Sequence, residues 1–358
     1  MRSKDRLMSP SVIKCENCGA DMLFNPLTGG LSCPYCDSKK DIARIGTRKR
    51  NFYTERDDSI VDDSTSTYKC PNCGGEVVFD SFVTATKCPF CSATNIVKLK
   101  DVGGLKPDGI LPFLYTKEMA YEAGKNWIKK KFFALASFKK NFKPDNFNGV
   151  YVPSYLFTSD THTTYKARLG EYYYVTVGSG KNRRTVRKTR WFSVSGEVVK
   201  VFHDVMIEAT RHLSQDELHK ITPYDVGSLE GYQRDYVAGF SAEKCDATLD
   251  TCFDTARVMM ENDIRREALS RYTYDVVGDY NAYTNYPLVA FNYALVPVWI
   301  FGCKHKEKIY RYIVNGRTGK SYGKYPLSPG RVSLTVFGAI AMIAGIVLIL
   351  LASNGLLG

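Results

Sequence analysis

The sequence predicts a mixed α+β fold with small cysteine-rich units at its N-terminal end and one apolar helix at its C-terminal end. Three observations lead to this prediction. Four Cys-x2-Cys pairs lie within residues 15–91 of the 358-residue chain. Tyrosine- and valine-rich stretches then alternate with helical patterns. Finally, residues 332–352 contain no charged side chain.

The cysteine pairs form two groups of four with identical spacing. Cys18 and Cys33 are separated by fourteen residues, as are Cys73 and Cys88. Two residues between cysteines allow one tight turn to direct both sulfurs at a metal, and the glycines that follow (Gly19, Gly74) permit a positive φ. Four thiolates fill a tetrahedral site and leave no position for substrate, so the metal is structural; zinc is predicted, with iron as the alternative. The predicted ligands of two zinc ions are Cys15, Cys18, Cys33 and Cys36 in the first group and Cys70, Cys73, Cys88 and Cys91 in the second.

The two groups define the domain organisation of the N-terminal part. The second repeats the first at an offset of 55 residues, because Cys15 corresponds to Cys70. We therefore predict zinc ribbon 1 at 11–42 and zinc ribbon 2 at 68–100. The segment between them, 43–67, has a basic start, an acidic Ser/Thr-rich end and no periodicity, which is typical of a flexible linker. Thiol pairs without a secretory signal indicate a reducing compartment.

Residues 101–330 are predicted to form an α+β domain. Its order of helix, strand with a Val-Pro step, and hairpin occurs twice, with Val152-Pro153 and Val296-Pro297 at corresponding places. An internal duplication is one explanation of this order, and the pattern alone does not decide for it. The predicted elements are helices at 117–133 and 249–272 and strands at 148–157, within 165–201 around a turn at 178–180, at 294–303 and at 309–314.

The net charge of +12 favours anionic partners, and most of the surplus lies in residues 102–331 rather than in the cysteine-rich part. Residues 181–190, directly after the glycine turn at 178–180, concentrate this positive charge. Phosphates of lipid or of nucleic acid would be attracted to such a hairpin tip, while a solvated loop explains the charges equally well. The predicted anion-binding residues are Lys181, Arg183, Arg184, Arg187, Lys188 and Arg190.

The sequence carries no recognised catalytic motif. The segment 316–321 (GRTGKS) resembles a phosphate-binding loop, but the first glycine of that motif would fall at Val314, and no helix is expected after it. We interpret the segment as a hairpin exit turn. The chain is therefore expected not to be an enzyme.

The uncharged segment 332–352 is long enough to cross a bilayer as a helix of about 1.5 Å rise per residue. Lys320, Lys324 and Arg331 precede it, and no charge follows it. Because basic residues favour the cytoplasmic side, the sequence predicts a single-pass protein of the cell membrane with its N-terminal bulk in the cytoplasm.

The cysteine units together with VPVWIFGCKHKEKIYRYIVNGRTGKSYG resemble a bacterial and phage group of membrane-linked double zinc-ribbon proteins. Its members are labelled as transcription-factor-type zinc-ribbon proteins or as relatives of the primosomal helicase. The helicase label is not carried over, because this chain has no Walker motif and no helicase core. The resemblance implies two zinc ribbons and a membrane link, and no established activity.

These observations favour a membrane-anchored cytoplasmic zinc-ribbon adaptor that binds a protein partner without catalysis. The alternative is a membrane-tethered nucleic-acid-binding protein, which the basic stretch at 181–190 suggests. The weaker point of that alternative is that the ribbons themselves are nearly neutral. An enzyme of unrecognised type in the α+β domain is the least favoured hypothesis.

Overall fold

The computed structural model describes residues 13–55, 61–62, 65–80, 88–91, 93, 97–98, 104–210, 213, 215–305 and 308–353. These residues form the predicted mixed α+β fold. Its helices are α1 (Lys117–Lys129), α2 (Ala136–Asn141), α3 (Gln215–Ile221), α4 (Leu249–Leu269) and α5 (Pro329–Ser353). Its long strands are β11 (Phe147–Val177), β12 (Arg184–Glu208), β15 (Val276–His305) and β16 (Lys308–Asn315). Its short strands are β1 (Leu23–Asn25), β2 (Gly30–Ser32), β3 (Lys39–Lys40), β4 (Arg50–Asn51), β5 (Val61–Asp62), β6 (Thr65–Lys69), β7 (Glu76–Asp80), β8 (Val97–Lys98), β9 (Gly104–Leu105), β10 (Gly109–Ile110), β13 (Glu230–Gly231), β14 (Ser241–Glu243) and β17 (Ser321–Gly323).

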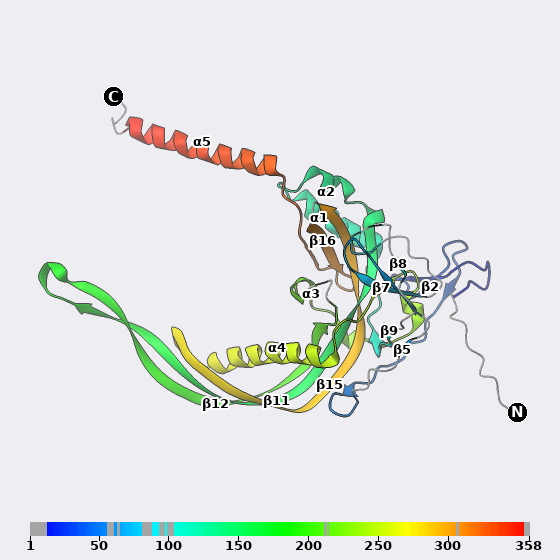
Figure 1. Cartoon of the computed structure of the whole chain (residues 1–358), viewed down its shortest axis with the longest axis horizontal. Coiled ribbons are helices and arrows are strands. Elements are labelled where there is room, and N and C mark those ends of the chain that lie inside the picture. The colour runs from blue at the N-terminus through cyan, green and yellow to red at the C-terminus, as the bar shows by residue number, and fades with distance from the viewer. Residues whose placement is uncertain are drawn as a thin grey trace.

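Three long antiparallel strands run through most of the molecule. β11 lies in the middle and pairs with β12 on one edge and with β15 on the other. One end of this sheet belongs to a compact body, and the other end projects from it as a curved ribbon along which α4 lies (Figure 1). We call residues 159–202 and 276–289 of these strands, with their connecting turn, the arm, and the remaining described residues without α4 and α5 the body.

In the body the sheet is covered on both faces. Phe147, Tyr151 and Phe301 pack with the buried side chains of α1 and α2 on one face. Val150 and Val298 pack on the other face with α3 and with the second cysteine unit. Burial on both faces explains why these parts of β11 and β15 read as nearly continuous apolar runs.

In the arm only one face of the sheet is covered. Between Thr161 and Leu169, buried and exposed side chains alternate along β11. The buried ones pack against α4, as Tyr165 does with Ile264 and Leu169 does with Leu269. A strand with one covered face is expected to alternate in this way.

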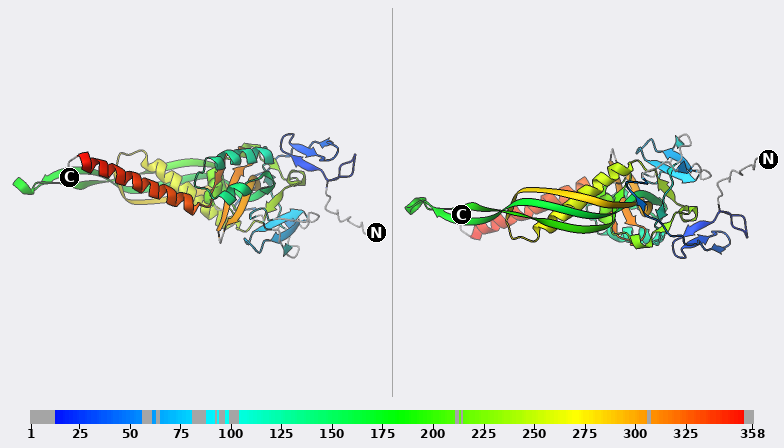
Figure 2. Two further views of the ribbon diagram at one scale, coloured as in Figure 1. Left: turned by 90° about the horizontal axis from the view of Figure 1, so that it is seen from above. Right: turned by 90° about the horizontal axis from the view of Figure 1, so that it is seen from below.

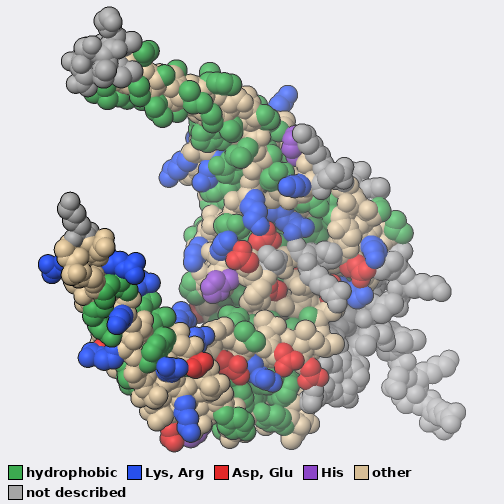
Figure 3. All heavy atoms as spheres, turned by 60° about the vertical axis from the view of Figure 1, so that its left-hand side comes forward, with side chains coloured by type: hydrophobic (Ala, Val, Ile, Leu, Met, Phe, Trp, Pro, Cys, Tyr) green, Lys and Arg blue, Asp and Glu red, His purple; other side chains and the backbone are tan. Residues whose placement is uncertain are grey.

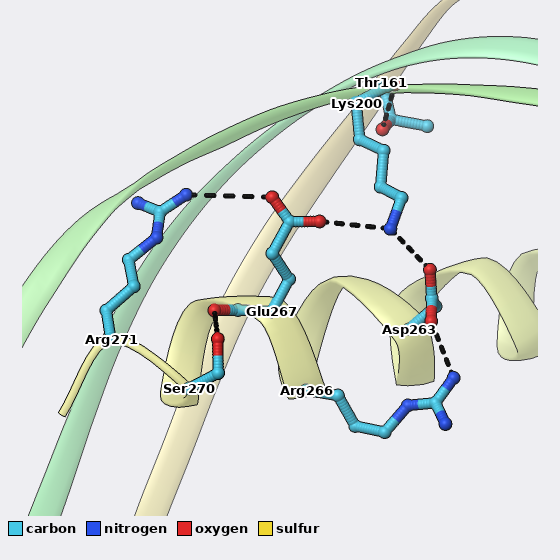
Figure 4. A network of polar contacts seen from close by, with 7 residues as sticks. All are labelled: Thr161, Lys200, Asp263, Arg266, Glu267, Ser270 and Arg271. Carbon is cyan, nitrogen blue, oxygen red and sulfur yellow. Dashed lines mark hydrogen bonds and ion pairs between the residues drawn. The ribbon is translucent and has the colours of Figure 1, made fainter. Parts of the chain in front are cut away.

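Charged side chains also hold α4 against the arm (Figure 4). Lys200 Nζ on β12 lies 2.5 Å from Asp263 Oδ2 and 3.0 Å from Glu267 Oε2, both on α4. Hydrogen bonds to these two carboxylates raise the pKa of Lys200. Arg271 lies 3.8 Å from the other oxygen of Glu267 and extends the network toward the end of the helix.

The observed strands are longer than the predicted ones. The strands expected at 148–157 and within 165–201 belong to β11 and β12, and the strand expected at 294–303 begins at Val276. Polar residues on the uncovered side of the arm face solvent, and Ser159, Thr161 and Thr163 are buried on the covered side, so both interrupt the apolar pattern without interrupting the strand. The helix expected at 117–133 ends at Lys129.

The two Val-Pro steps lie opposite each other in neighbouring strands. Val152 on β11 is the register partner of Val296 on β15, and Tyr151 is the partner of Pro297. A helix precedes each strand and a hairpin follows it, as α1 precedes β11 and α4 precedes β15. The duplication that the sequence suggests stays a prediction.

The predicted flexible linker, 43–67, differs from expectation in its described N-terminal half. β4 pairs with β15 at Ala290 and Phe291. Phe52 is buried, and its ring centroid lies 4.4 Å from that of Phe253 on α4. Short strand pairing and one buried aromatic side chain attach this half to the body, a long-range effect that local composition does not reveal. Residues 56–60, 63 and 64 lie outside the described residues.

Helix α5 leaves the body at its N-terminal end and projects on the same side as the arm (Figures 1 and 2). Within it, Pro329–Leu350 has a mean hydropathy of 2.6 and is 0% buried inside the protein. Arg331 fixes its base, because its Nη1 donates to the carbonyl of Phe132 at 2.6 Å. The predicted segment 332–352 thus lies in one helix that is long and apolar enough to span a membrane.

Candidate metal centres and the arm tip

The first four-cysteine group forms a compact cluster of sulfurs. The Sγ atoms of Cys15, Cys18, Cys33 and Cys36 all lie within 4.8 Å of one another. Cys15 and Cys36 are 3.5 Å apart, and Cys18 and Cys33 are 3.4 Å apart. The turn after Cys18 uses Gly19 at φ +74°, whose amide donates to the carbonyl of Cys15 at 2.8 Å. This is the conformation for which glycine was expected at that position.

The second group has the same geometry. The sulfurs of Cys70, Cys73, Cys88 and Cys91 also lie within 4.8 Å of one another. Cys70 and Cys91 are 3.7 Å apart, and Cys73 and Cys88 are 3.6 Å apart. Gly74, at φ +76°, donates its amide to Cys70 at 2.8 Å. The two clusters thus share the same glycine turn and similar sulfur separations.

Both clusters fit a metal ion. A tetrahedral site with metal–sulfur bonds of about 2.3 Å has edges of about 3.8 Å, close to the observed sulfur separations. In the first cluster, the Ser38 hydroxyl lies 3.1 Å from Cys36 Sγ, and hydrogen bonding to Ser38 lowers the pKa of Cys36 to about 6. In the second, hydrogen bonds from Cys73, Cys88 and Asn72 lower the pKa of Cys91. A readily formed thiolate is the state that binds metal.

The second cysteine unit is part of the body's sheet and core. Its strand β7 pairs with β14, which pairs in turn with β11. Phe90, next to the ligand Cys91, is fully buried. Gly302 of β15 lies so close that an added Cβ would be 2.0 Å from the Phe90 carbonyl oxygen. The Asn148 side chain also donates to the Pro89 carbonyl at 3.3 Å.

The first cysteine unit has its own sheet, β1–β2–β3, and contacts the body mainly through side chains. The ring of Phe24 lies 5.5 Å from that of Tyr236 and 6.3 Å from that of Phe240. One backbone hydrogen bond, from the Phe24 amide to Ala238, accompanies this contact at 3.0 Å. This unit also exposes Tyr35 and Leu27, at 81% and 72% of their surfaces.

The predicted anion-binding residues lie at the end of the arm, around the turn between β11 and β12. We call residues 171–191 the arm tip. Lys and Arg side chains gather there in the space-filling view (Figure 3). Arg190 lies 2.6 Å from Glu171, and the guanidinium of Arg187 lies 4.2 Å from the ring centroid of Tyr172. The side chain of Lys181 lies outside the described residues; the exposed cations are Arg183, Arg184, Arg187, Lys188 and Arg190.

Exposed aromatic side chains accompany these cations and were not among the predicted site residues. Tyr174 is the register partner of Arg187, and 68% of its surface is exposed. Tyr173 and Trp191 are 45% and 40% exposed. The sequence contains a signal for them, since three consecutive tyrosines lie on one strand and a tryptophan directly follows the basic stretch on the other.

The phosphate-loop-like segment and the remaining cysteines have structural rather than chemical roles. The segment 316–321 forms the turn between β16 and β17 and is not followed by a helix. Burial raises the pKa of Cys245 to about 11 and that of Cys252 to about 12, so both stay protonated thiols at neutral pH. The two four-cysteine clusters and the arm tip are therefore the candidate sites of the described chain.

The fold and these sites define a chain with two cysteine clusters that could each hold a metal and one helix that could span a membrane. It is similar to the uncharacterised protein YdjG of Bacillus subtilis (strain 168), with 28% identity over 323 residues, 89% of this chain and 91% of that protein. No family model matches the chain. No solved structure matches it either.

Proposed function

We propose that the protein is a membrane-anchored cytoplasmic adaptor that holds two structural zinc ions and binds a protein partner without catalysis. In this proposal α5 is the single transmembrane anchor. The basic residues that precede it, Lys320, Lys324 and Arg331, favour the cytoplasmic side for the body. The chain would then belong to the membrane-linked double zinc-ribbon proteins that its sequence resembles.

One observation supports the adaptor function most directly. Tyr35 and Phe90 occupy the same position in the two cysteine units, between the cysteines of the second pair. Phe90 is fully buried against the body, whereas Tyr35 is 81% exposed. In ribbon 2 this position therefore packs into the protein core. In ribbon 1 the same position stays exposed, where a partner can contact it. Exposed aromatic residues of this kind are enriched where proteins bind each other.

A photo-crosslinking residue at position 35 of the full chain in its native membranes tests this function. We expect a discrete adduct with a cytoplasmic protein that weakens when Leu27, the other strongly exposed apolar residue of ribbon 1, is changed to Asp. The matched control places the same crosslinker at Tyr53, another exposed tyrosine. Equal adducts from both positions, or an adduct indifferent to Leu27→Asp, would contradict the proposal.

The identity of the metal is tested separately by elemental mass spectrometry of the purified full chain. We expect two zinc ions per chain. Iron in either cluster would leave the fold of the ribbons unchanged but would contradict the zinc assignment, because iron occupies the same four sulfurs.

A further inference from the structure

The arm tip has no cover on either face. α4 ends at Leu269, which packs against Leu169 on β11. β11 and β12 continue beyond this point as a two-stranded hairpin that extends into solvent (Figure 1). A two-stranded hairpin with both faces in water is marginal by itself. Its length and its side chains therefore call for an explanation other than packing against α4.

The side chains of the tip are sorted by the pleat of the sheet. Tyr165 and Leu169 face α4, so even-numbered residues of β11 and their register partners lie on the opposite face, which we call the outer face. Tyr174 pairs with Arg187 and Gly170 pairs with Trp191, which puts all four on the outer face. This face continues along the arm with exposed Val199, Val201, Tyr283 and Leu288, whose register partners on β11 are even-numbered.

Two glycines give Trp191 its position. A Cβ on Gly170 would lie 3.1 Å from the Trp191 ring, and a Cβ on Gly278 would lie 2.8 Å from it. The indole thus lies across β11 and β15 in a space that a side chain at Gly170 or Gly278 would fill. Arg168 lies over the same ring at 4.9 Å from its centroid. The indole is held flat and near the surface, with 40% of the residue still exposed.

The charged residues of the tip are almost all positive. Glu171 is its one acidic residue in the sequence, and it is paired with Arg190. Exposed Arg183, Arg184 and Lys188 have no acidic residue near them in the hairpin sequence. A cationic surface with exposed tyrosine and tryptophan matches the headgroup region of a bilayer, where aromatic rings lie at the interface and Lys and Arg meet lipid phosphates.

The position of the arm favours a membrane over a nucleic acid. The arm and α5 project from the same side of the body in two perpendicular views (Figures 1 and 2). A chain anchored by α5 would keep its arm at a high local concentration next to the bilayer. Charged residues on both faces of the arm, such as Lys166 and Lys200, exclude it from the hydrocarbon. The arm runs alongside α5 and its tip extends beyond the C-terminal end of that helix (Figures 1 and 2), so the tip meets the bilayer surface only when α5 turns where it leaves the body.

We propose that the arm tip is a second membrane contact. Arg187 on its outer face binds anionic lipid headgroups together with Arg183 at the turn and with Arg184 and Lys188 on the opposite face, and Tyr174 and Trp191 on the outer face insert at the interface. This inference rests on the anchoring by α5 in the proposed function. With two points of attachment, α5 and the arm tip, the distance and orientation of the body relative to the bilayer would be fixed.

The test uses the intrinsic fluorescence of the full chain in vesicles of phosphatidylcholine alone or with about 30% phosphatidylserine. The other tryptophans are the partly buried Trp127 and the buried Trp299, so the difference between wild type and Trp191→Phe isolates the signal of Trp191 in the tip. We expect acrylamide to quench this signal at least twofold less in the acidic vesicles, and lipids brominated near the headgroup to quench it more.

A charge variant, R183Q/R184Q/R187Q/K188Q, should lose this lipid dependence. The matched control, K39Q/K40Q/K106Q/R257Q, removes four exposed cations from other parts of the chain and should retain it. If Trp191→Phe does not fold, the dependence on phosphatidylserine within the wild-type chain gives the same answer. Equal quenching of Trp191 in both vesicle types would overturn the proposal.

Further outcomes separate the arm from the anchor. A chain that resists carbonate extraction but shows no protection of Trp191 overturns the arm contact alone. A chain that carbonate removes, yet whose Trp191 is protected by acidic vesicles, contradicts the anchor and supports the arm contact. Protection by a single-stranded oligonucleotide that persists at about 200 mM salt, without protection by lipid, assigns the tip to nucleic acid and overturns the proposal.

Discussion

The two cysteine units place four sulfurs in the same geometry but are attached to the molecule in different ways. The second contributes β7 to the large sheet through β14, and three of its four cysteines lie in the same core cluster as Val298 and Ile300. The first keeps a sheet of its own and joins the other core cluster of the body through side chains such as Phe24 and Leu31, without strand pairing to the large sheet. Four-cysteine spacing therefore determines a local fold, while the surroundings decide whether that fold supports the body or presents a surface.

Loss of one metal ligand should show the largest difference between the units. Cys88→Ser should remove the second metal and expose the core on one face of the sheet, because metal binding supplies about 10 kcal/mol or more to such sites. Cys33→Ser, the equivalent change, should loosen residues 13–42 and leave the sheet folded. Hydrogen exchange of the full chain in detergent, followed at β15 and β16, measures both. Similar exchange of β15 in the two variants would contradict the comparison.

Removal of one aromatic side chain from the same repeat position should give the next largest difference. Phe90→Ala should lower the free energy of unfolding by about 3–5 kcal/mol, because it empties a fully buried site. Tyr35→Ala should change it by less than about 0.5 kcal/mol, because the side chain is exposed. Urea unfolding in detergent micelles compares the two, and equal losses would show that ribbon 1 packs more deeply than its exposure indicates.

The attachment of ribbon 2 should also depend on pH. Glu243 lies in β14, next to β7, and burial raises its pKa to about 8. Burial raises the pKa of Glu208, at the neighbouring end of β12, to about 7. The folded state keeps these protons while the unfolded state releases them, so stability is greatest at low pH and falls as the pH rises through these values. The loss reaches about 1.4 kcal/mol per pH unit for each group.

Glu243→Gln should therefore flatten the decrease in the free energy of unfolding between about pH 6 and pH 8. The measurement is urea unfolding at several pH values with zinc present. Glu16→Gln, a change of an exposed acid in ribbon 1, is the matched control and should leave the slope unchanged. A Glu243→Gln slope equal to that of the wild type would place the pH dependence elsewhere in the molecule.

The smallest effect concerns hydrogen bonds to the ligand sulfurs. The Asn72 amide donates to Cys91 Sγ at 3.3 Å, and the Ser38 hydroxyl lies 3.1 Å from Cys36 Sγ. Asn72→Ala and Ser38→Ala should each weaken metal binding at their own site by about tenfold and leave the other site unchanged. Competition with a chromogenic chelator measures both affinities. A change at the distant site would indicate coupling between the units that their separate sheets do not suggest.

The features predicted correctly from the sequence depend on nearby residues. A Cys-x2-Cys turn with Gly19 or Gly74 assembles its sulfurs locally, and the uncharged stretch of α5 needs no partner to be recognised. The docking of the ribbons could not be predicted in this way. A Pro-aromatic step occurs in both units, and packing in the folded body, beside Gly75 and Gly302, distinguishes Phe90 from Tyr35. The burial of Phe52 in the predicted linker has the same long-range origin.

The length of the arm strands also escaped prediction for a physical reason. Between Val276 and Val289, β15 carries tyrosines, asparagines and one aspartate, which do not form a buried strand pattern. Half of them face solvent on the outer face, and α4 covers the other side. The basic stretch at 181–190 was visible in the sequence, but the placement of Arg187 on one face with Tyr174 and Trp191 required the strand register.

The pairing of β11 with β15 has a consequence for how the chain reaches its folded state. Gly170 pairs with Val276 and Phe147 pairs with Phe301, so the partners are separated by more than a hundred residues along the chain. During synthesis β11 and β12 can close as a hairpin well before β15 leaves the ribosome, and one edge of β11 remains open until then. Contacts this distant in sequence slow folding, and an open edge invites pairing with a wrong strand. The risk of misassembly should therefore be greatest in the interval of translation between the two strands.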